Sequence, residues 1–175
     1  NIGSVARLCA NFGVDQLRLV NPRCDPKSRE SRQMAVHAGV RLEKASLHSS
    51  LESAVADCTR VVATCGRLDH GVIPLQNPDQ ALNWLMTGAG TVAVVFGRED
   101  RGLTNEELRI CHRVLTLHSG ESYPSLNLSH AVAIVLHDMA RLGQNLPPEG
   151  ERSPDPASPA QLSGLMEDAA DLLLD

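Results

Sequence analysis

Three polar clusters carry the side chains of this sequence that could do chemistry. They lie at residues 1–7 (NIGSVAR), 96–107 (FGREDRGLTNEE) and 123–129 (YPSLNLS), with apolar stretches between them. Each cluster also has a structural explanation, because Asn1 or Ser125 could cap a helix and Glu107 could close a capping box. For any one cluster alone that explanation is the better one. The presence of all three in one chain favours a functional site.

The second cluster follows a pattern that is typical of ligand-binding loops. Residues 92–96 form a mostly β-branched run, which suits a strand buried on both faces of a parallel sheet. Residues 97–102 then place four charged side chains between two glycines, and Thr104 and Glu107 have the spacing of a capping box. Open α/β sheets bind their ligands in such loops, beyond the carboxyl ends of the strands.

The same loop nearly matches the phosphate-binding pattern G-x-x-x-x-G-K-[ST], but Leu103 occupies the lysine position. That lysine would reach the β- and γ-phosphates of a nucleotide, and Glu99 and Asp100 add negative charge inside the loop. A mononucleotide-phosphate enzyme is therefore disfavoured. The spacings of cysteine and histidine match no common zinc pattern, so we expect no metal site.

Composition and charge limit the possible classes of protein. The chain has 175 residues, enough for one domain of about 150 residues and an appendage. Its five cysteines have no paired spacing, which indicates a reducing, cytoplasmic location, and no apolar run reaches the ~18 residues of a membrane span. The net charge is −5, yet residues 1–44 carry eight Lys and Arg side chains against four Asp and Glu. On charge alone, this basic segment is either a phosphate-contacting surface or a solvated face.

Alternating apolar patterns predict an α/β fold with a mostly parallel sheet and helices on both faces. We expect strands at residues 17–20, 61–64, 92–96 and 114–117. Helices are expected at residues 2–12, 28–38 (ending at Gly39), 49 to about 57 (capped by Ser49 with Glu52), 78–86 (capped by Asn77), after Thr104, and at 127–142.

The chain is expected to have three parts. Residues 1–146 form the main domain, residues 147–159 a proline-rich linker that joins no core, and residues 160–175 a C-terminal amphipathic helix. Ser158 and Gln161 have the spacing to cap this helix. Its apolar stripe should bury against a second subunit or a further part of the chain.

Together, the three clusters resemble the signature motifs of a known family. The patterns are Asn-x-Gly-Ser-x-x-Arg, Phe-Gly-Arg-Glu-x-x-Gly-Leu-Thr-Asn-Glu-Glu and Ser-Leu-Asn-Leu-Ser-x-Ala-Val. They resemble the SPOUT-class RNA 2′-O-ribose methyltransferases of the TrmH/SpoU branch, and are most similar to the TrmJ-type tRNA methyltransferases. The resemblance covers nearly all of residues 1–145. It implies a deep trefoil knot, a homodimer and S-adenosylmethionine (SAM) as cofactor, with a first strand expected upstream of Asn1.

The resemblance also implies roles for individual residues. Catalysis falls to Asn1, Arg7, Glu99, Ser125 and Asn127. The cofactor loops are represented by Thr64, Cys65, Gly66, Gly97, Leu117, Pro124, Ser125 and Leu126. Contacts to RNA are expected from Arg7, Arg23, Lys27, Arg29 and Arg32. Apolar walls and closely approaching glycines in the cofactor loops suit an adenine ring.

The implied reaction is SAM-dependent methylation of a ribose 2′-hydroxyl in structured RNA, with the tRNA anticodon loop as the first expectation. An rRNA substrate, or a non-catalytic RNA-binding module on the same fold, are the alternatives. The family often assigns Arg7 as general base, but lowering a guanidinium pKa from above ~12 to near 7 costs about 7 kcal/mol. We favour a role for Arg7 in clamping an RNA phosphate and stabilising the developing alkoxide, while a phosphate oxygen or water accepts the proton.

Overall fold

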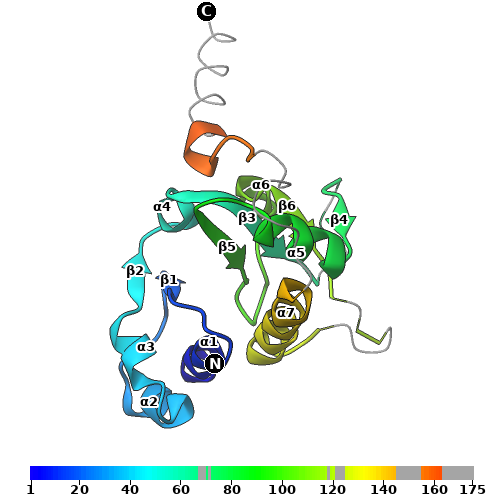
Figure 1. Cartoon of the computed structure of the whole chain (residues 1–175). Helices are drawn as coiled ribbons and strands as arrows, with labels where there is room; N and C mark the ends of the chain where they lie inside the picture. The colour runs from blue at the N-terminus through cyan, green and yellow to red at the C-terminus, as the bar shows by residue number, and fades with distance from the viewer. Residues whose placement is uncertain (67–69, 71, 118, 121–124, 145–154, 163–175) are drawn as a thin grey trace, which may run out of the picture.

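The computed structural model describes residues 1–66, 70, 72–117, 119–120, 125–144 and 155–162 (Figure 1). Its helices are α1 (Ile2–Asn11), α2 (Arg29–Ala35), α3 (Gly39–Glu43), α4 (Leu51–Val55), α5 (Pro78–Met86), α6 (Asn105–Ile110) and α7 (Leu128–Gly143). Its strands are β1 (Arg18–Val20), β2 (Ser46–His48), β3 (Cys58–Thr64), β4 (Leu75–Gln76), β5 (Thr91–Val95) and β6 (Arg113–Leu115).

A four-stranded sheet in the order β4-β6-β3-β5 forms the centre of the protein. Each neighbouring pair in it is parallel. β3 has a neighbour on each side, and its residues 60–63 are buried. The parallel pairing confirms the fold class predicted from the alternation of strands and helices.

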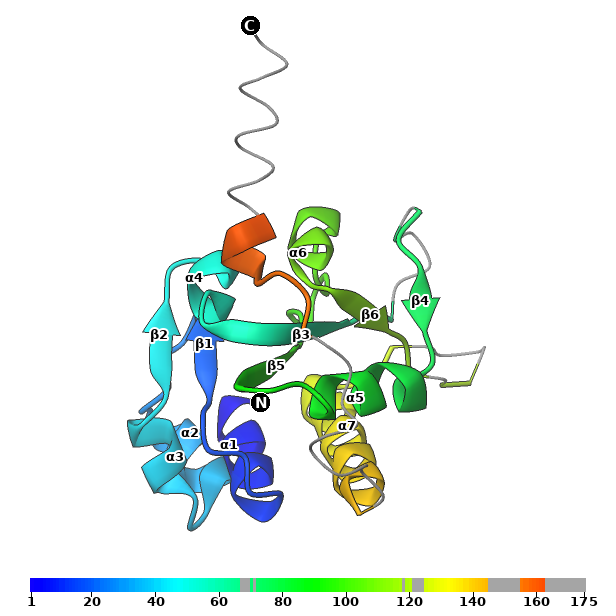
Figure 2. The ribbon, with the colours of Figure 1, turned by 45° about the horizontal axis from the view of Figure 1, so that its top comes forward.

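Helices cover both faces of this sheet, as Figure 2 shows for α4 and α6 on one side and α5 and α7 on the other. Successive side chains of a strand point to opposite faces. Accordingly, Val61 of β3 packs into the core that includes Leu108 of α6, whereas Val62 packs into the core that includes Leu85 of α5. The prediction of helices on both faces is confirmed.

A smaller layer holds the first polar cluster. β1 and β2 form a separate two-stranded parallel sheet, beside which α1, α2 and α3 pack together (Figure 1). α1 lies so close to α2 that a Cβ atom at Gly3 would come within 2.0 Å of the Ser31 carbonyl oxygen. α1 also contacts α7. The start of the chain is therefore held beside the helix that follows the third cluster.

The prediction that residues 92–96 form a strand buried on both faces was wrong in its burial. β5 is an edge strand, and among its five residues only Val95 is buried. An apolar β-branched run is equally compatible with a central and an edge position, since its two faces can pack against helices in both. The central strand is β3, which begins at Cys58 rather than at Val61 as expected.

Two helix boundaries also differ from the prediction. The helix expected over residues 28–38 ends at Ala35, because Val36 adopts a left-handed backbone with φ of 54°. Gly39 begins α3 instead of ending a helix. The capping box of α4 joins Ser50 and Ser53, one residue later than expected. A serine hydroxyl can close such a box as glutamate does.

The predictions for the C-terminal segment divide into three. The linker was expected to join no core, and this was wrong for its last residues, because Asp155 contacts Arg60 and Pro159 is buried. The Ser158–Gln161 capping box is confirmed, with the Ser158 amide donating to Gln161 Oε1 at 2.8 Å. Residues 147–154 of the expected linker, and residues 163–175 of the expected C-terminal helix, lie outside the described residues. In the described part of the chain, no helix has the length and apolarity to cross a bilayer.

Candidate active site

The carboxyl ends of β3, β5 and β6 meet at one edge of the sheet. Ala63 pairs with Val95, and Thr64 pairs with Leu115, so the residues after these strands emerge side by side. Thr64 Oγ1 donates to the Val95 carbonyl at 3.2 Å, and the Cys65 amide donates to the Leu115 carbonyl at 2.9 Å. The sheet thus brings three of the predicted cofactor loops together at the edge where α/β proteins bind ligands.

Gly97 is required by the turn that follows β5. A Cβ atom at this position would lie 2.3 Å from the carbonyl carbon of Gly102 and 2.4 Å from the Leu103 nitrogen. The loop is closed by the Gly102 amide, which donates to the Arg98 carbonyl at 2.8 Å, while Gly102 itself has φ of 69°. Both glycines have a backbone reason, which is independent of phosphate binding. Across the edge, a Cβ atom at Gly66 would meet no described atom within 4 Å.

Three of the four charged side chains of the loop take part in ion pairs. Arg98 forms an ion pair with Asp100, and Arg101 Nη2 lies 3.5 Å from Glu107 Oε1. Glu107 also closes the predicted capping box of α6, since its Oε2 accepts from the Thr104 amide at 2.7 Å. The structural explanation of Glu107 is therefore confirmed.

Glu99 differs, because its carboxylate accepts a hydrogen bond from the side-chain amide of Asn1. This contact joins the first and second polar clusters, which lie 98 residues apart in sequence. The pKa of Glu99 is lowered, first by a hydrogen bond from its own backbone amide and then by the Asn1 amide. Glu99 is thus kept as a carboxylate acceptor that fixes the orientation of Asn1.

Arg7 lies on α1, one turn and a half beyond Asn1, and its side chain is exposed. No hydrogen bond or ion pair to another described residue holds it. A guanidinium that no other described residue engages is available to contact a phosphate or a developing alkoxide.

In the third cluster, Asn127 has a clear structural task. Its Oδ1 accepts from the Ser129 amide at 2.9 Å and from the Ser129 hydroxyl at 2.8 Å, which caps α7. Ser125 and Leu126 are exposed, and Pro124 lies outside the described residues. No described contact joins this cluster to Asn1 or Glu99. The catalytic roles of Ser125 and Asn127 stay predictions.

The predicted RNA-binding residues fall into two groups. Lys27, Arg29 and Arg32 line one open depression together with Gln33. Arg23 instead lies beside the loop of the second cluster, with its Nη1 3.5 Å from Asp100 Oδ2, although both side chains are largely exposed. The basic segment therefore extends from the depression toward the candidate active site.

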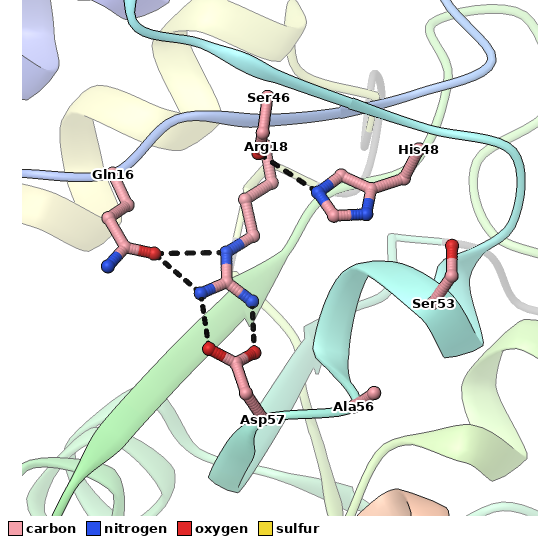
Figure 3. Close-up of a pocket in the computed structure, with 7 residues that line it drawn as sticks. All are labelled: Gln16, Arg18, Ser46, His48, Ser53, Ala56 and Asp57. Carbon is pink, nitrogen blue, oxygen red and sulfur yellow. Dashed lines mark hydrogen bonds and ion pairs between the residues drawn. The ribbon is translucent and has the colours of Figure 1, made fainter.

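A second pocket, shown in Figure 3, has a structural explanation. Its Arg18 guanidinium donates to Gln16, to both carboxylate oxygens of Asp57 and to the Ala54 carbonyl. These bonds tie β1 to the end of α4 and use the donors of the guanidinium, as Figure 3 shows for Gln16 and Asp57. The sequence analysis gave Arg18 only as part of the basic segment.

The effect of Arg18 on the pKa of Asp57 should be measurable in a pH titration. The hydrogen bonds from Arg18 lower the pKa of Asp57 to about 2. Because this pKa is lower in the folded state, the Arg18–Asp57 pair stabilises the fold fully at pH values above the ordinary carboxyl pKa. This contribution to the free energy of unfolding is lost as the pH falls through about 2. We expect the carboxyl of Asp57, followed by carbon-detected NMR, to titrate near its ordinary pKa in Arg18→Met. An unchanged pKa in that variant would contradict the assignment.

Among the described residues, no group of three His, Cys, Asp or Glu side chains is arranged to hold a metal ion. The five cysteines are free thiols, and Cys24 is exposed while the other four are buried. Burial raises the pKa of Cys111 to about 12 and that of Cys58 to about 11, so neither is suited to act as a thiolate nucleophile.

The carboxyl edge of the parallel sheet carries the Gly97 turn, and beside it the Asn1–Glu99 hydrogen bond joins two of the polar clusters. Residues 1–137 match the SpoU rRNA Methylase family, and the chain belongs to it.

Several similar proteins carry names that specify an enzyme within this family. The tRNA (cytidine-2'-O-)-methyltransferase TrmJ of Methanocaldococcus jannaschii is 36% identical over 143 residues, which are 79% of this chain and 61% of the relative. The tRNA (cytidine/uridine-2'-O-)-methyltransferase TrmJ of Escherichia coli (strain K12) is 38% identical over 143 residues, 79% of this chain and 57% of the relative. The crystal structure of TrmJ from Z. mobilis ZM4 matches with a TM-score of 0.84 and 31% identity, covering 98% of this chain and 73% of that one. The chain thus spans about three fifths of the length of these two curated relatives.

Proposed function

We propose that this protein transfers a methyl group from SAM to a ribose 2′-hydroxyl of tRNA. The observation that carries the proposal is the hydrogen bond from Asn1 to Glu99, which unites two of the three polar clusters near the carboxyl edge of the sheet. Membership of the SpoU family and the tRNA 2′-O-methyltransferases among its relatives support this reaction and this substrate. The free cysteines support a reducing, cytoplasmic location.

The carboxyl edge suits SAM. Thr64, Cys65 and Gly66 would lie on one side of the cofactor, and the Gly97 turn and Leu117 on the other, with Ser125 and Leu126 completing the loops. The close backbone approach at Gly97 allows backbone groups to face an adenine ring. When bound, SAM supplies the electrophilic methyl group, so the protein has to bind, orient and stabilise charge. A trefoil knot formed by these loops remains a prediction.

Each polar residue would have a separate role in the reaction. Glu99 fixes the Asn1 amide, and Asn1 in turn can orient the ribose. Arg7 would clamp the adjoining phosphate and stabilise the negative charge that develops on the 2′-oxygen. A phosphate oxygen or a water molecule would accept the proton, because keeping a guanidinium neutral is too costly at neutral pH.

Two measurements test the proposal. Calorimetric titration with SAM is expected to show binding, and transfer of a labelled methyl group to unmodified tRNA should exceed transfer to an rRNA fragment of equal length. Binding of SAM without transfer to either RNA would favour the non-catalytic module. Preferred transfer to rRNA would favour the alternative substrate, and absence of SAM binding would refute the proposal.

We also propose that the protein works as a homodimer. A chain with net charge −5 must bind a polyanion, and its positive charge is concentrated in residues 1–44. One such segment offers few phosphate contacts, whereas a two-fold dimer presents two copies to one RNA. The depression formed by Lys27, Arg29 and Arg32 would be one contact point in each copy.

The double substitution Arg29→Glu and Arg32→Glu is expected to weaken tRNA binding about tenfold or more, and to make it less dependent on salt. The affinity for SAM should not change, because both side chains are exposed and neither belongs to the predicted cofactor loops. The double substitution Glu43→Gln and Lys44→Gln, on exposed residues outside the depression, is the control. Fluorescence anisotropy with labelled tRNA measures the effect, and sedimentation should show a dimer before RNA is added. A monomer with full activity would overturn the dimer proposal.

A further inference from the structure

A buried arginine lies at the opposite edge of the sheet from the candidate active site. Arg60 is the third residue of β3, and its side chain has no exposed surface. Its guanidinium donates to the Trp84 carbonyl and to Thr87 Oγ1, and lies 4.8 Å from the centre of the Trp84 ring. Burying a charge is costly unless an opposite charge is placed against it.

A carboxylate that pairs with Arg60 comes from the C-terminal segment. Arg60 Nε donates to Asp155 Oδ1 at 2.6 Å, across 95 residues of sequence. The other carboxylate oxygen, Oδ2, accepts from the backbone amide of Ala89 at 3.2 Å. Asp155 is therefore held by a buried cation and a main-chain donor at the same time. These two donors restrict the position of the carboxylate more than the single contact of a surface ion pair would.

Two further contacts fix the residues that follow. His112 Nδ1 accepts from the Val61 amide at 3.0 Å, so its Nε2 carries the proton and donates to the Ala157 carbonyl at 2.8 Å. Pro159 is buried, and the Ser158–Gln161 capping box begins a helix at residues 159–162. In both views this orange segment lies near α4 and α6 (Figures 1 and 2).

The anchoring residues share one position in the topology. Arg60 is near the start of β3, Ala89 precedes β5, and His112 precedes β6. In a parallel sheet the starts of the strands lie at one edge, and the cofactor loops lie at the other. The C-terminal segment therefore binds to the amino edge, away from the carboxyl edge.

We propose that residues 155–162 are a permanent part of the methyltransferase domain, held on the amino edge of the sheet by Asp155, for which Arg60 and the Ala89 amide form a dedicated carboxylate socket. The last residues of the proline-rich linker, from Asp155 onward, are thus bound to the domain. The helical turn at residues 159–162 therefore starts from a fixed point of the domain, and this anchoring is independent of SAM binding and of the identity of the RNA.

Asp155→Asn tests the socket, and Asp79→Asn is its matched control. Asp79 forms an ion pair of the same length, 2.6 Å, with Arg141, but both partners are about half exposed. We expect Asp155→Asn to lower Tm by about 6–15 °C, because it leaves a buried charge with a weaker partner. Asp79→Asn should change Tm by no more than about 3 °C. Equal shifts in the two variants would overturn the proposal.

Hydrogen exchange gives a second readout that general destabilisation does not reproduce. Under native conditions the Ala89 amide should exchange about tenfold faster in Asp155→Asn, while amides in the middle of β3 remain protected. The Kd for SAM, measured well below Tm, should stay within about twofold of the wild type, since the carboxyl edge is untouched. Unchanged exchange at Ala89, or a loss of SAM affinity larger than this, would contradict an anchor confined to the amino edge.

If Asp155→Asn does not fold, the double substitution Arg60→Met with Asp155→Leu tests the same pairing. It removes the buried charge together with the Asp155 carboxylate, and the Trp84 carbonyl keeps its hydrogen bond from Thr87 at 3.0 Å. This variant is expected to fold. Failure of both variants to fold would show that Arg60 is needed for reasons other than Asp155.

Discussion

Arg7→Ala is expected to lower the rate of methyl transfer by about two orders of magnitude or more, with little change in SAM affinity. Arg7 is exposed on α1 and not held by other described residues, so its removal should leave the fold intact. The loss is expected because, in the proposed mechanism, the Arg7 guanidinium stabilises charge that develops only in the transition state. Single-turnover methyl transfer to tRNA, with calorimetry for SAM, separates the chemical step from binding.

Arg7→Lys should recover only part of the activity. Lysine supplies a positive charge but lacks the planar fork that can bind a phosphate oxygen and the 2′-oxygen together. Arg109→Ala, which removes an exposed arginine from α6, is the control and should retain wild-type turnover. Wild-type turnover in Arg7→Ala would show that the proposed role is wrong.

Gly97→Ala is expected to weaken SAM binding by about ten- to a hundredfold. The new Cβ atom would meet backbone atoms of Gly102 and Leu103 at 2.3–2.4 Å, and backbone cannot move aside as a flexible side chain can. The loop after β5 must open, at a cost of about 1–3 kcal/mol. This opening would also displace Glu99 from Asn1, so methyl transfer should fall further than SAM affinity.

Gly143→Ala provides the control for this substitution. Gly143 is the last residue of α7, and a Cβ atom there would meet nothing within 4 Å. The SAM affinity and the methyl-transfer rate of Gly143→Ala should equal those of the wild type. If Gly97→Ala binds SAM as tightly as Gly143→Ala, then the loop after β5 does not form part of the cofactor site.

Local patterns in the sequence identified much of the secondary structure. The capping box of Thr104 with Glu107 and the Asn77 cap of α5 are confirmed, because a cap is decided by side chains within about four residues. The period of apolar residues also identified the parallel α/β class, since burial on both faces of a sheet requires near-continuous apolar strands. Where non-local packing decides the outcome, the prediction failed: β5 resembles a central strand in sequence, yet it lies at the edge.

For the candidate site, the sequence by itself determined the three polar clusters and, through their resemblance to a family, the class of protein. Only the tertiary structure decided which cluster residues meet. It joins Asn1 to Glu99 and uses Asn127 to cap α7. It also places Asp155 against Arg60, a pairing that no sequence spacing predicts. The physical reason is that ion pairs and hydrogen bonds between residues about 100 positions apart depend on the topology of the sheet, whereas caps and periodicity depend on neighbours along the chain.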